Sequence, residues 1–424
     1  MCASRTDHST ETPEKILAGR RYRLYPTEVQ GRKLTRWVTT ARAIYNAGLE
    51  QRRFAYRVCG KSVSLYEQSA ELTVARSELA WVKDLPAQVG HQALGQLDVA
   101  FRRFYQGVAG YPKFKRRGKP IGLRFPQFVE VRRINRRWGE VKLAKLGWVP
   151  FRWTRKPGGE IRHATVKKDA LGWHVSLCVK LDRPPDAVNG GPGVGVDLGI
   201  VALAATSDGD LTKGVFWTPS ERRRQLRLER KLAKQQIGSN RWRATVQQIG
   251  RIRARVARRR RDTLHKLSSR LAMDYGLVAV ENLDIKSLTR SARGTLDAPG
   301  TNVKVKAAQN REILERGWGE LVHQLEYKCR WYGSKLVKVD PRFTSQTCSA
   351  CGKQDGNSRE SQARFRCTGC GHRANADVNA ARVVLARGRT DAARGTPGGR
   401  AWRLGRSGST DEPRIASGEP VLDS

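Results

Sequence analysis

Three acidic residues, far apart in the chain, stand in settings suited to binding divalent metal ions. Asp197 lies in Gly193-Val-Gly-Val-Asp-Leu-Gly-Ile-Val201, Glu281 ends the apolar run Leu277-Val-Ala-Val-Glu281, and Asp377 lies in Asn375-Ala-Asp-Val-Asn-Ala-Ala-Arg382. Carboxylates are preferred Mg²⁺ ligands, and two such ions can activate water and neutralise a scissile phosphate. The three acids are therefore candidate catalytic residues and candidate ligands of two Mg²⁺ ions.

Each acid also has an ordinary structural interpretation. Asp197 could belong to a turn at a strand end, Glu281 could lie near the start of a helix, and Asp377 could be a solvated acid on a helix. The order of an Asp on a first strand, a Glu on a later strand and an Asp on a late helix favours one shared site.

Four of the eight cysteines form two Cys-x-x-Cys pairs, Cys348 with Cys351 and Cys367 with Cys370, with fifteen residues between the pairs. This spacing is typical of a four-thiolate tetrahedral zinc site. Four protein ligands fill the coordination shell, so one structural Zn²⁺ is expected and His372 is not needed as a ligand. Whether the zinc segment also contacts DNA is left open. Ordinary thiols are expected at the scattered cysteines Cys2, Cys59, Cys178 and Cys329.

The charge balance indicates a polyanionic partner. The 424 residues include 81 Lys and Arg against 39 Asp and Glu, which gives a formal net charge of +42. Nucleic acid is the first expectation and an anionic membrane a distant second. No apolar stretch reaches the length of about 18 residues that a membrane span requires, and the first thirteen residues lack the apolar core of a signal peptide. A cytoplasmic protein on the nucleoid is therefore expected.

The segment from Glu221 to Arg261 concentrates this charge. It contains sixteen Lys or Arg and two Glu, a balance of 16 − 2 = +14. The segment could be a solvated charged face, but such a charge density favours contact with the phosphates of RNA or an RNA–DNA hybrid. The expected nucleic-acid contacts are Arg222, Arg223, Arg224, Arg227, Arg258, Arg259, Arg260 and Arg261.

The N-terminal half combines short strands with a helical insert. A strand is expected at residues 16–25, a helical pattern runs from 27 to about 107, and short strands between 122 and 180 predict a small β-barrel or sandwich. Residues 181–192 form a Pro- and Gly-rich linker. Core packing is favoured over base stacking for five aromatic residues: Trp37, Tyr45, Phe54, Phe101 and Tyr105.

The C-terminal half alternates buried strands with helices, which favours an α/β fold. Strands are expected at residues 194–205, 277–280 and 335–340, and helices at 221–261, broken at 238–240, and at 313–331. From about residue 388 the composition predicts a disordered basic tail.

Eight segments make the chain resemble the transposon-associated TnpB nucleases and the compact type V CRISPR effectors. The resemblance spans roughly residues 15 to 385 and is most specific from Gly193 onward. The segments are Arg20-Arg-Tyr-Arg-Leu-Tyr-Pro26, Gly110-Tyr-Pro-Lys-Phe-Lys115, Gly193-Val-Gly-Val-Asp-Leu-Gly199, Gly238-Ser-Asn-Arg-Trp-Arg243, Asp262-Thr-Leu-His-Lys-Leu-Ser268, Val280-Glu-Asn-Leu283, Thr344-Ser-Gln-Thr-Cys-Ser-Ala-Cys-Gly352 and Asn375-Ala-Asp-Val-Asn-Ala-Ala381.

The resemblance implies a RuvC-like, RNase H-type α/β nuclease domain with an inserted zinc ribbon, and an N-terminal wedge β-barrel with a helical recognition insert. The implied division is a disordered tail at 1–13, the wedge-like β-barrel at 14–26 and 108–189, the recognition insert at 27–107, the nuclease domain at 190–342 (with basic helices at 221–261) and 373–387, the zinc ribbon at 343–372, and a disordered basic tail at 388–424.

The implied activity is RNA-guided cleavage of double-stranded DNA. A guide RNA would select the target by base pairing, while the protein reads a short flanking motif. Asp197, Glu281 and Asp377 match the three catalytic acids of the family. Two alternatives are a transposase with an RNase H-like core acting without RNA, and a guide-directed DNA binder with little cleavage. The oligomeric state is open, with a monomer slightly favoured.

Overall fold

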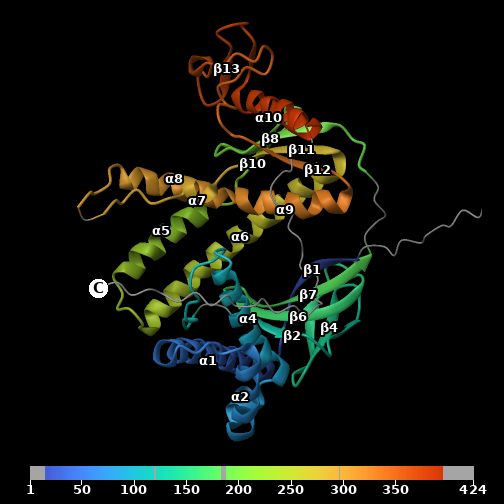
Figure 1. Cartoon of the computed structure of the whole chain (residues 1–424), viewed down its shortest axis with the longest axis vertical. Helices are drawn as coiled ribbons and strands as arrows, with labels where there is room; N and C mark the ends of the chain where they lie inside the picture. The colour runs from blue at the N-terminus through green and yellow to red at the C-terminus, as the bar shows by residue number, and fades with distance from the viewer. Residues whose placement is uncertain (1–14, 119–120, 183–187, 296, 395–424) are drawn as a thin grey trace, which may run out of the picture. The chain divides into compact units, whose positions relative to one another are not determined.

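The computed structural model describes residues 15–118, 121–182, 188–295 and 297–394, which form two compact units (Figure 1). The first unit comprises the chain up to residue 188 together with 214–268 and 331–333. The second comprises 189–213, 269–330 and the chain from 334 onward. The predicted tail at 1–13, residues 395–424 of the tail predicted at 388–424, and residues 183–187 of the predicted linker lie outside the described residues.

Two antiparallel sheets build the β-structure of the first unit. One sheet has the order β1-β7-β6-β2, from Lys15–Arg23, Gly172–Asp182, Glu160–Asp169 and Leu123–Phe125. The other has the order β3-β4-β5, from Glu130–Arg133, Trp138–Leu143 and Gly147–Arg152. The two sheets share one apolar core and are linked by a bridge between Leu24 and Phe151. This confirms the predicted small β-fold.

Four helices lie between the first two strands, as the sequence pattern predicts. They are α1 Glu28–Cys59, α2 Leu65–Glu78, α3 Ala80–Asp84 and α4 Ala87–Tyr105. α1 begins at a capping box in which Thr27 and Gln30 satisfy each other's backbone N–H groups. It ends at Gly60, whose φ of 63° is a left-handed conformation that glycine adopts easily because it has no Cβ. α1 and α4 face each other through their apolar stripes, which bury side chains such as Trp37 and Leu97.

The aromatic residues of this helical region divide into two groups. Trp37, Tyr45 and Phe101 are 0%, 2% and 5% exposed, which confirms their expected place in the core. Phe54 and Tyr105 are 55% and 73% exposed, so of the five only these two retain surfaces on which a base could stack.

The basic segment forms two helices, α5 Pro219–Ala233 and α6 Asn240–Asp274. The predicted break is confirmed at Gly238, which has a φ of 86°. α5 begins with a capping box between Thr218 and Glu221 and with Pro219 in its first turn. The sequence-based division places 221–261 with the nuclease domain, whereas residues 214–268 group with the first unit. The sequence of an Arg-rich helix shows that it has an apolar stripe, but it does not show against which unit that stripe packs.

A mixed five-stranded sheet forms the centre of the second unit. Its order is β10-β9-β8-β11-β12, from Leu211–Lys213, Ala202–Thr206, Gly193–Asp197, Leu277–Glu281 and Lys335–Val339. β8, β11 and β12 run parallel, whereas β9 and β10 are antiparallel to their neighbours. The predicted strands near 194–205, 277–280 and 335–340 are confirmed.

Helices α7 Ile285–Leu288, α8 Val303–Arg316 and α9 Trp318–Tyr332 follow β11, and α10 Ala376–Ala393 is the last described helix. Gly317, with a φ of 75°, separates α8 from α9. α10 lies on β8 and β11 (Figure 1) and continues past residue 388, where the sequence composition predicts disorder. That boundary is wrong because α10 packs Gly388 closely against Ala279 of β11.

An internal cluster of charged groups surrounds His174 on β7. The ring is 5% exposed, and its Nε2 atom lies 2.6 Å from a guanidinium nitrogen of Arg258 on α6. Since that nitrogen can only donate, Nε2 accepts and the ring proton is on Nδ1, 3.5 Å from the Asp169 carboxylate. Burial, with the positive charges of Arg21 and Arg258, lowers the pKa of His174 to about 4.

We expect this histidine to make the first unit sensitive to acid. The unfolded chain takes up the proton near the ordinary pKa of 6.5, whereas the folded ring does so only near pH 4. Stability is therefore lost as the pH falls from 6.5 through 4, by at most about 3 kcal/mol. The change in melting temperature between about pH 7.5 and pH 4.5 should be smaller in His174→Gln, which keeps an acceptor for Arg258. An equal change in both proteins would contradict this assignment.

Candidate active site and metal centre

The parallel pairing of β8 and β11 brings the first two acids together. Val196 is paired with Val280, so the residues that follow, Asp197 and Glu281, end neighbouring strands at the same edge of the sheet. Both strands are buried apolar runs, and the sheet edge at their carboxyl ends is where parallel sheets place functional side chains. Glu281 is only 7% exposed.

The third acid is placed by the first turn of α10. The side chain of Asn375 caps this helix and accepts hydrogen bonds from the backbone N–H groups of Asp377 at 3.0 Å and Val378 at 3.2 Å. α10 can lie on β8 because Gly195 has no side chain: a Cβ there would be 2.0 Å from the carbonyl oxygen of Ala381. The Asp377 carboxylate is thereby held close to the end of β8, and its residue is 8% exposed.

The three carboxyl groups are close enough to influence one another electrostatically. Burial, followed by the negative charges of Glu281 and Asp377, raises the pKa of Asp197 to about 7. Burial also raises the pKa of the other two carboxyl groups. Such a group of buried acids is stable as carboxylates only beside compensating positive charge. The residues present therefore fit divalent cations.

Glu281 has a partner that the sequence did not predict. The hydroxyl of Thr344 donates a hydrogen bond of 2.6 Å to Glu281 Oε1, and Thr344 is 3% exposed. This bond opposes the rise in the pKa of Glu281 that burial causes. Thr344 lies just before the first cysteine pair, so this hydrogen bond connects the start of the cysteine-containing segment to Glu281.

Asp377 also has an unpredicted partner. A guanidinium nitrogen of Arg359 lies 3.2 Å from Asp377 Oδ1 and lowers the pKa of both Asp377 and Asp197. Arg359 comes from the loop between the two cysteine pairs. Neither Thr344 nor Arg359 has a distinctive spacing from the acids, so only the folded arrangement identifies them.

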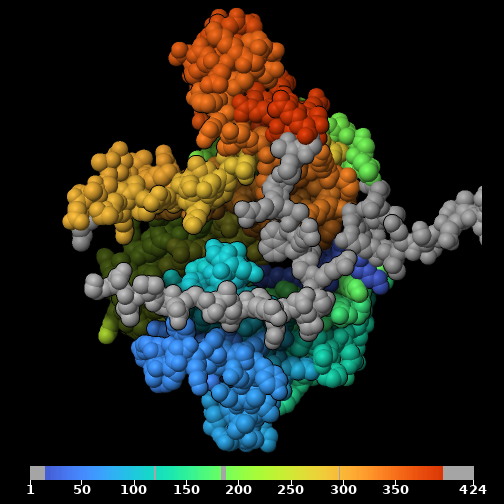
Figure 2. Space-filling model, viewed as in Figure 1, coloured from blue at the N-terminus to red at the C-terminus, as the bar shows by residue number. Residues whose placement is uncertain are grey.

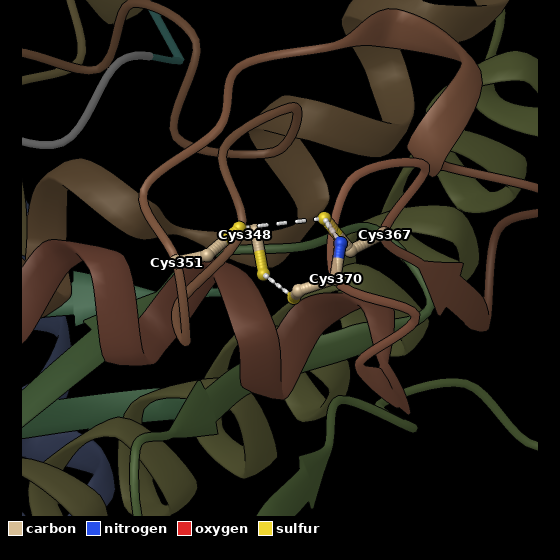
Figure 3. A group of neighbouring side chains, drawn as sticks. All are labelled: Cys348, Cys351, Cys367 and Cys370. Carbon is tan, nitrogen blue, oxygen red and sulfur yellow. Dashed lines mark hydrogen bonds between the residues drawn. The ribbon is translucent and has the colours of Figure 1, made fainter.

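The four cysteines meet at one point, which confirms that they cluster (Figure 3). Their Sγ atoms all lie within 4.8 Å of one another, with Cys348 and Cys370 at 3.8 Å and Cys351 and Cys367 at 3.6 Å. A tetrahedron of sulfur atoms about 2.3 Å from a zinc ion has edges of about 3.8 Å. The cluster therefore fits one Zn²⁺.

Backbone N–H groups prepare these sulfur atoms for metal binding. Gly369 donates to Cys367 Sγ at 3.3 Å, and Ala350 donates to Cys348 Sγ at 3.4 Å. Hydrogen bonds from the backbone of Cys370 and Gly369 lower the pKa of Cys367 to about 6. The thiolate, which is the form that binds zinc, is thus favoured at neutral pH.

The cysteine segment is a small lobe joined to α10. It contains a hairpin of β13 Arg364–Arg366 and β14 Arg373–Asn375 and appears in orange beside α10 in Figure 2. Asn379 of α10 is fully buried; its side chain donates to the carbonyl of Thr347 at 2.8 Å and accepts from the N–H of Ser349 at 3.0 Å. The same helix therefore holds the third acid and the first cysteine pair.

Among the carboxylates and thiols of the described residues, only the four cysteines form a group of three or more ligands whose donor atoms all lie within 4.8 Å. The carboxylates of Asp197, Glu281 and Asp377 are therefore more widely spread than one shared ion would need. Such a spread is compatible with two ions, which in two-metal sites lie about 3.5–4 Å apart.

The predicted basic contacts lie on two helices of the first unit. Arg222, Arg223, Arg224 and Arg227 are exposed on α5. On α6, Arg258 contacts Asp169 and His174, and Arg259 donates to the carbonyl of Phe216 at 2.9 Å and pairs with Glu221. Arg260 and Arg261 also have interactions within the protein. Part of the basic cluster on α6 thus stabilises the fold.

Comparisons with known proteins cover most of the chain. Residues 176–292 match the family described as "Probable transposase" (OrfB of IS605), residues 318–384 match "Cas12f1-like, TNB domain", and residues 16–61 match a helix-turn-helix domain of the same OrfB group. The Escherichia coli (strain K12) protein named "Putative RNA-guided DNA endonuclease InsQ" is 33% identical over 376 residues, which are 88% of this chain and 93% of that protein. The chain belongs to the TnpB family.

Two further similarities agree with TnpB membership. A Streptomyces pristinaespiralis protein named "Putative RNA-guided DNA endonuclease" is 33% identical and covers 95% of this chain and 98% of its own length. The solved structure of a Cas12f1–sgRNA–target DNA complex has a TM-score of 0.52 at 15% identity and covers 85% of this chain and 83% of that one. The second similarity concerns the fold, which this TnpB protein shares with a compact type V effector.

No helix in the described part of this TnpB protein is long and apolar enough to cross a lipid bilayer.

Proposed function

We propose that this TnpB protein is an RNA-guided DNA endonuclease with one RuvC-like, RNase H-type active site. The observation that carries the proposal is the convergence of Asp197, Glu281 and Asp377 at the carboxyl ends of β8 and β11 and the start of α10. Relatives that align over nearly their whole length bear the name RNA-guided DNA endonuclease. The mixed sheet with parallel β8, β11 and β12 supports an RNase H-type core.

The negative charges of both Glu281 and Asp377 act on Asp197. Asp197 would therefore hold both Mg²⁺ ions, with Glu281 on one ion and Asp377 on the other. When bound, the ions supply an activated water and neutralise the charge that develops on the phosphate. The chain itself fixes the carboxylate of Glu281 through Thr344, and that of Asp377 through Arg359 and the Asn375 cap. Because there is one such site, the two DNA strands are cut in succession.

The remaining parts have complementary roles in the proposal. Residues 14–26 and 108–189 belong to the wedge and 27–107 to the recognition insert. The nuclease domain comprises 190–213, 269–342 and 373–393, the basic residues 214–268 group with the first unit, and 343–372 are the ribbon with one structural Zn²⁺. The exposed arginines of α5 contact nucleic-acid phosphates, and the guide RNA selects a double-stranded DNA target beside a short flanking motif. The protein acts as a monomer on the nucleoid in the cytoplasm.

The decisive experiment has two stages. The chain is expressed with its native flanking DNA, and the RNA that copurifies is sequenced; a discrete structured RNA with a variable end is expected. The complex is then given Mg²⁺ and a DNA target matching that end. Cleavage of the matched target, and not of a mismatched one, is expected. Heterogeneous RNA or unspecific cleavage would contradict the guided function.

The family description as a transposase supports one alternative, strand transfer without RNA. The same preparation distinguishes the two, because a transposase joins a cut end to a second DNA molecule. Joined products formed by RNA-free protein would favour the alternative, whereas cleaved ends without joining favour the endonuclease.

Thr344 provides a prediction about positioning. Thr344→Val keeps the shape of the side chain but removes the hydrogen bond to Glu281, whereas Thr344→Ser keeps the hydroxyl. Groups that orient a metal ligand change metal affinity or activity by about 10–100-fold when removed. We therefore expect Thr344→Val to need more Mg²⁺ for half-maximal cleavage and Thr344→Ser to behave like the wild type. Equal Mg²⁺ dependence of the wild type and both variants would show that the Thr344 hydroxyl does not position Glu281 for metal binding.

A further inference from the structure

A cavity of about 130 Å³ in the second unit has Glu281, one of the three acids, in its wall. One wall comprises Leu198, just after β8, and residues 281–283, at the end of β11. The opposite wall is one face of α9, and Lys338 of β12 closes a side. Glu281 belongs both to this cavity and to the acid site, and Leu198 directly follows Asp197, so the two adjoin.

The lining excludes an anionic ligand and favours a neutral, flat one. Lys338 is the cavity's only Lys or Arg among the described residues, and its Nζ lies 2.6 Å from Glu326 Oε1. Glu326 and Glu281 would both repel a phosphate within the cavity. The rest of the lining is largely apolar with a few polar edges: Leu198, Leu283, Ile285, Trp318 and Val322, with Asn282 and His323.

A nucleobase has this combination of apolar faces and polar edges. The buried Nε1–H of Trp318 has no hydrogen-bond acceptor in the described part of the chain, so the indole N–H of a wall residue is unsatisfied. The amide of Asn282, on an exposed residue, can approach the edge of a base. Stacking against apolar and aromatic surfaces accepts any base, since every base has a π-face.

We propose that this cavity receives the base of the nucleotide next to the phosphate held by Asp197, Glu281 and Asp377. The inference rests on the proposed nuclease function. Successive nucleotides of a stacked strand are about 3.4 Å apart, so a base adjoining the bound phosphate reaches a cavity whose wall includes Glu281. The cavity aligns the strand for cleavage by holding a base without reading its identity.

Gly319 offers a way to fill the cavity without disturbing the fold. It lies on α9 in the cavity wall and is exposed, and a Cβ added there would meet no atom within 4 Å. Replacing a helical glycine by leucine also favours the helix. Gly319→Leu should therefore fold like the wild type, and Gly319→Ala is the matched control because it adds only a methyl group.

The test compares guided complexes on matched DNA, with and without an abasic nucleotide on either side of the cut. In single turnovers, we expect the wild type and Gly319→Ala to cleave about ten-fold more slowly when the base on one side is missing. Gly319→Leu should cleave intact DNA about ten-fold more slowly and be indifferent to the missing base. Target binding should be unchanged. Equal rates for Gly319→Leu and wild type, or an abasic site without effect in the wild type, would overturn the proposal.

A second measurement does not depend on cleavage. A short single-stranded oligonucleotide containing 2-aminopurine is titrated with the full chain, and base fluorescence is followed. Quenching by the wild type that is lost in Gly319→Leu supports the cavity, and equal quenching by both contradicts it. If the wild type quenches but never cleaves matched DNA, the nuclease function fails while the base cavity stands.

Discussion

Replacing Asp197 by asparagine is expected to lower DNA cleavage by roughly 10³-fold or more, because several kcal/mol of metal-dependent charge stabilisation are lost. The substitution keeps the size of the side chain and removes one negative charge from the site. Guide RNA and target binding should remain within a few-fold of the wild type, since Asp197 is half-buried and the proposed binding uses exposed arginines.

The fold should survive this substitution and even gain stability. Burial and the two neighbouring acids raise the pKa of Asp197 to about 7, so its ionised form is unfavourable in the metal-free protein. When a carboxyl group has a higher pKa in the folded protein than in the unfolded chain, its ionisation lowers the stability of the fold as the pH rises above the pKa of the unfolded chain. At about pH 8 without metal, Asp197→Asn should therefore melt no lower than the wild type. Mg²⁺ should raise the melting temperature of the wild type more than that of the variant.

The matched control is Asp274→Asn, which changes an exposed aspartate of the same unit. It should cleave at the wild-type rate. Wild-type cleavage by Asp197→Asn would exclude Asp197 from the site, and a large fall in its melting temperature would show that the residue is needed for folding instead.

Replacing Cys367 by serine is expected to abolish zinc binding and unfold the ribbon. The four sulfur atoms meet at tetrahedral spacing, and Cys367 is 3% exposed within a small core that also contains Phe365. In a lobe this small the metal supplies most of the stability; structural zinc contributes about 10–16 kcal/mol in isolated zinc-finger peptides. Elemental analysis should find one zinc per wild-type chain and much less in the variant.

Cleavage should fall as well, because the ribbon holds two of the acids. Thr344 donates to Glu281 and Arg359 pairs with Asp377, and both come from the segment that zinc orders. Cys59→Ser is the control, since Cys59 is exposed and far from the cluster in sequence. Full zinc content in Cys367→Ser, or a zinc-free wild type, would exclude the cluster as a zinc site.

Much of the site can be predicted from sequence because its signals are local. A buried apolar run that ends in an acid indicates Asp197 and Glu281 as candidates, and two Cys-x-x-Cys pairs predict the four cysteines that the fold brings together. Thr344 and Arg359 could not be predicted, because they lie 63 and 18 residues from the acids they contact and only the folded ribbon brings them there.

The errors have equally physical causes. An Arg-rich composition after residue 388 resembles a disordered tail, yet Gly388 lets α10 continue against Ala279. The arginine run 258–261 looks uniform in sequence, but Arg258 and Arg259 have partners within the protein. Composition describes a segment as a whole, whereas these outcomes depend on single contacts.

The insertion of the ribbon between β12 and α10 determines when the site is completed during synthesis. Asp377 follows Asp197 by 377 − 197 = 180 residues and comes after the last cysteine of the ribbon. At about 5–20 residues per second, a ribosome needs roughly 9–36 seconds to cover this interval. The basic helices α5 and α6 are made well before the third acid. A nascent chain, or one whose translation stops within the ribbon, therefore has the basic helices without a complete set of metal ligands.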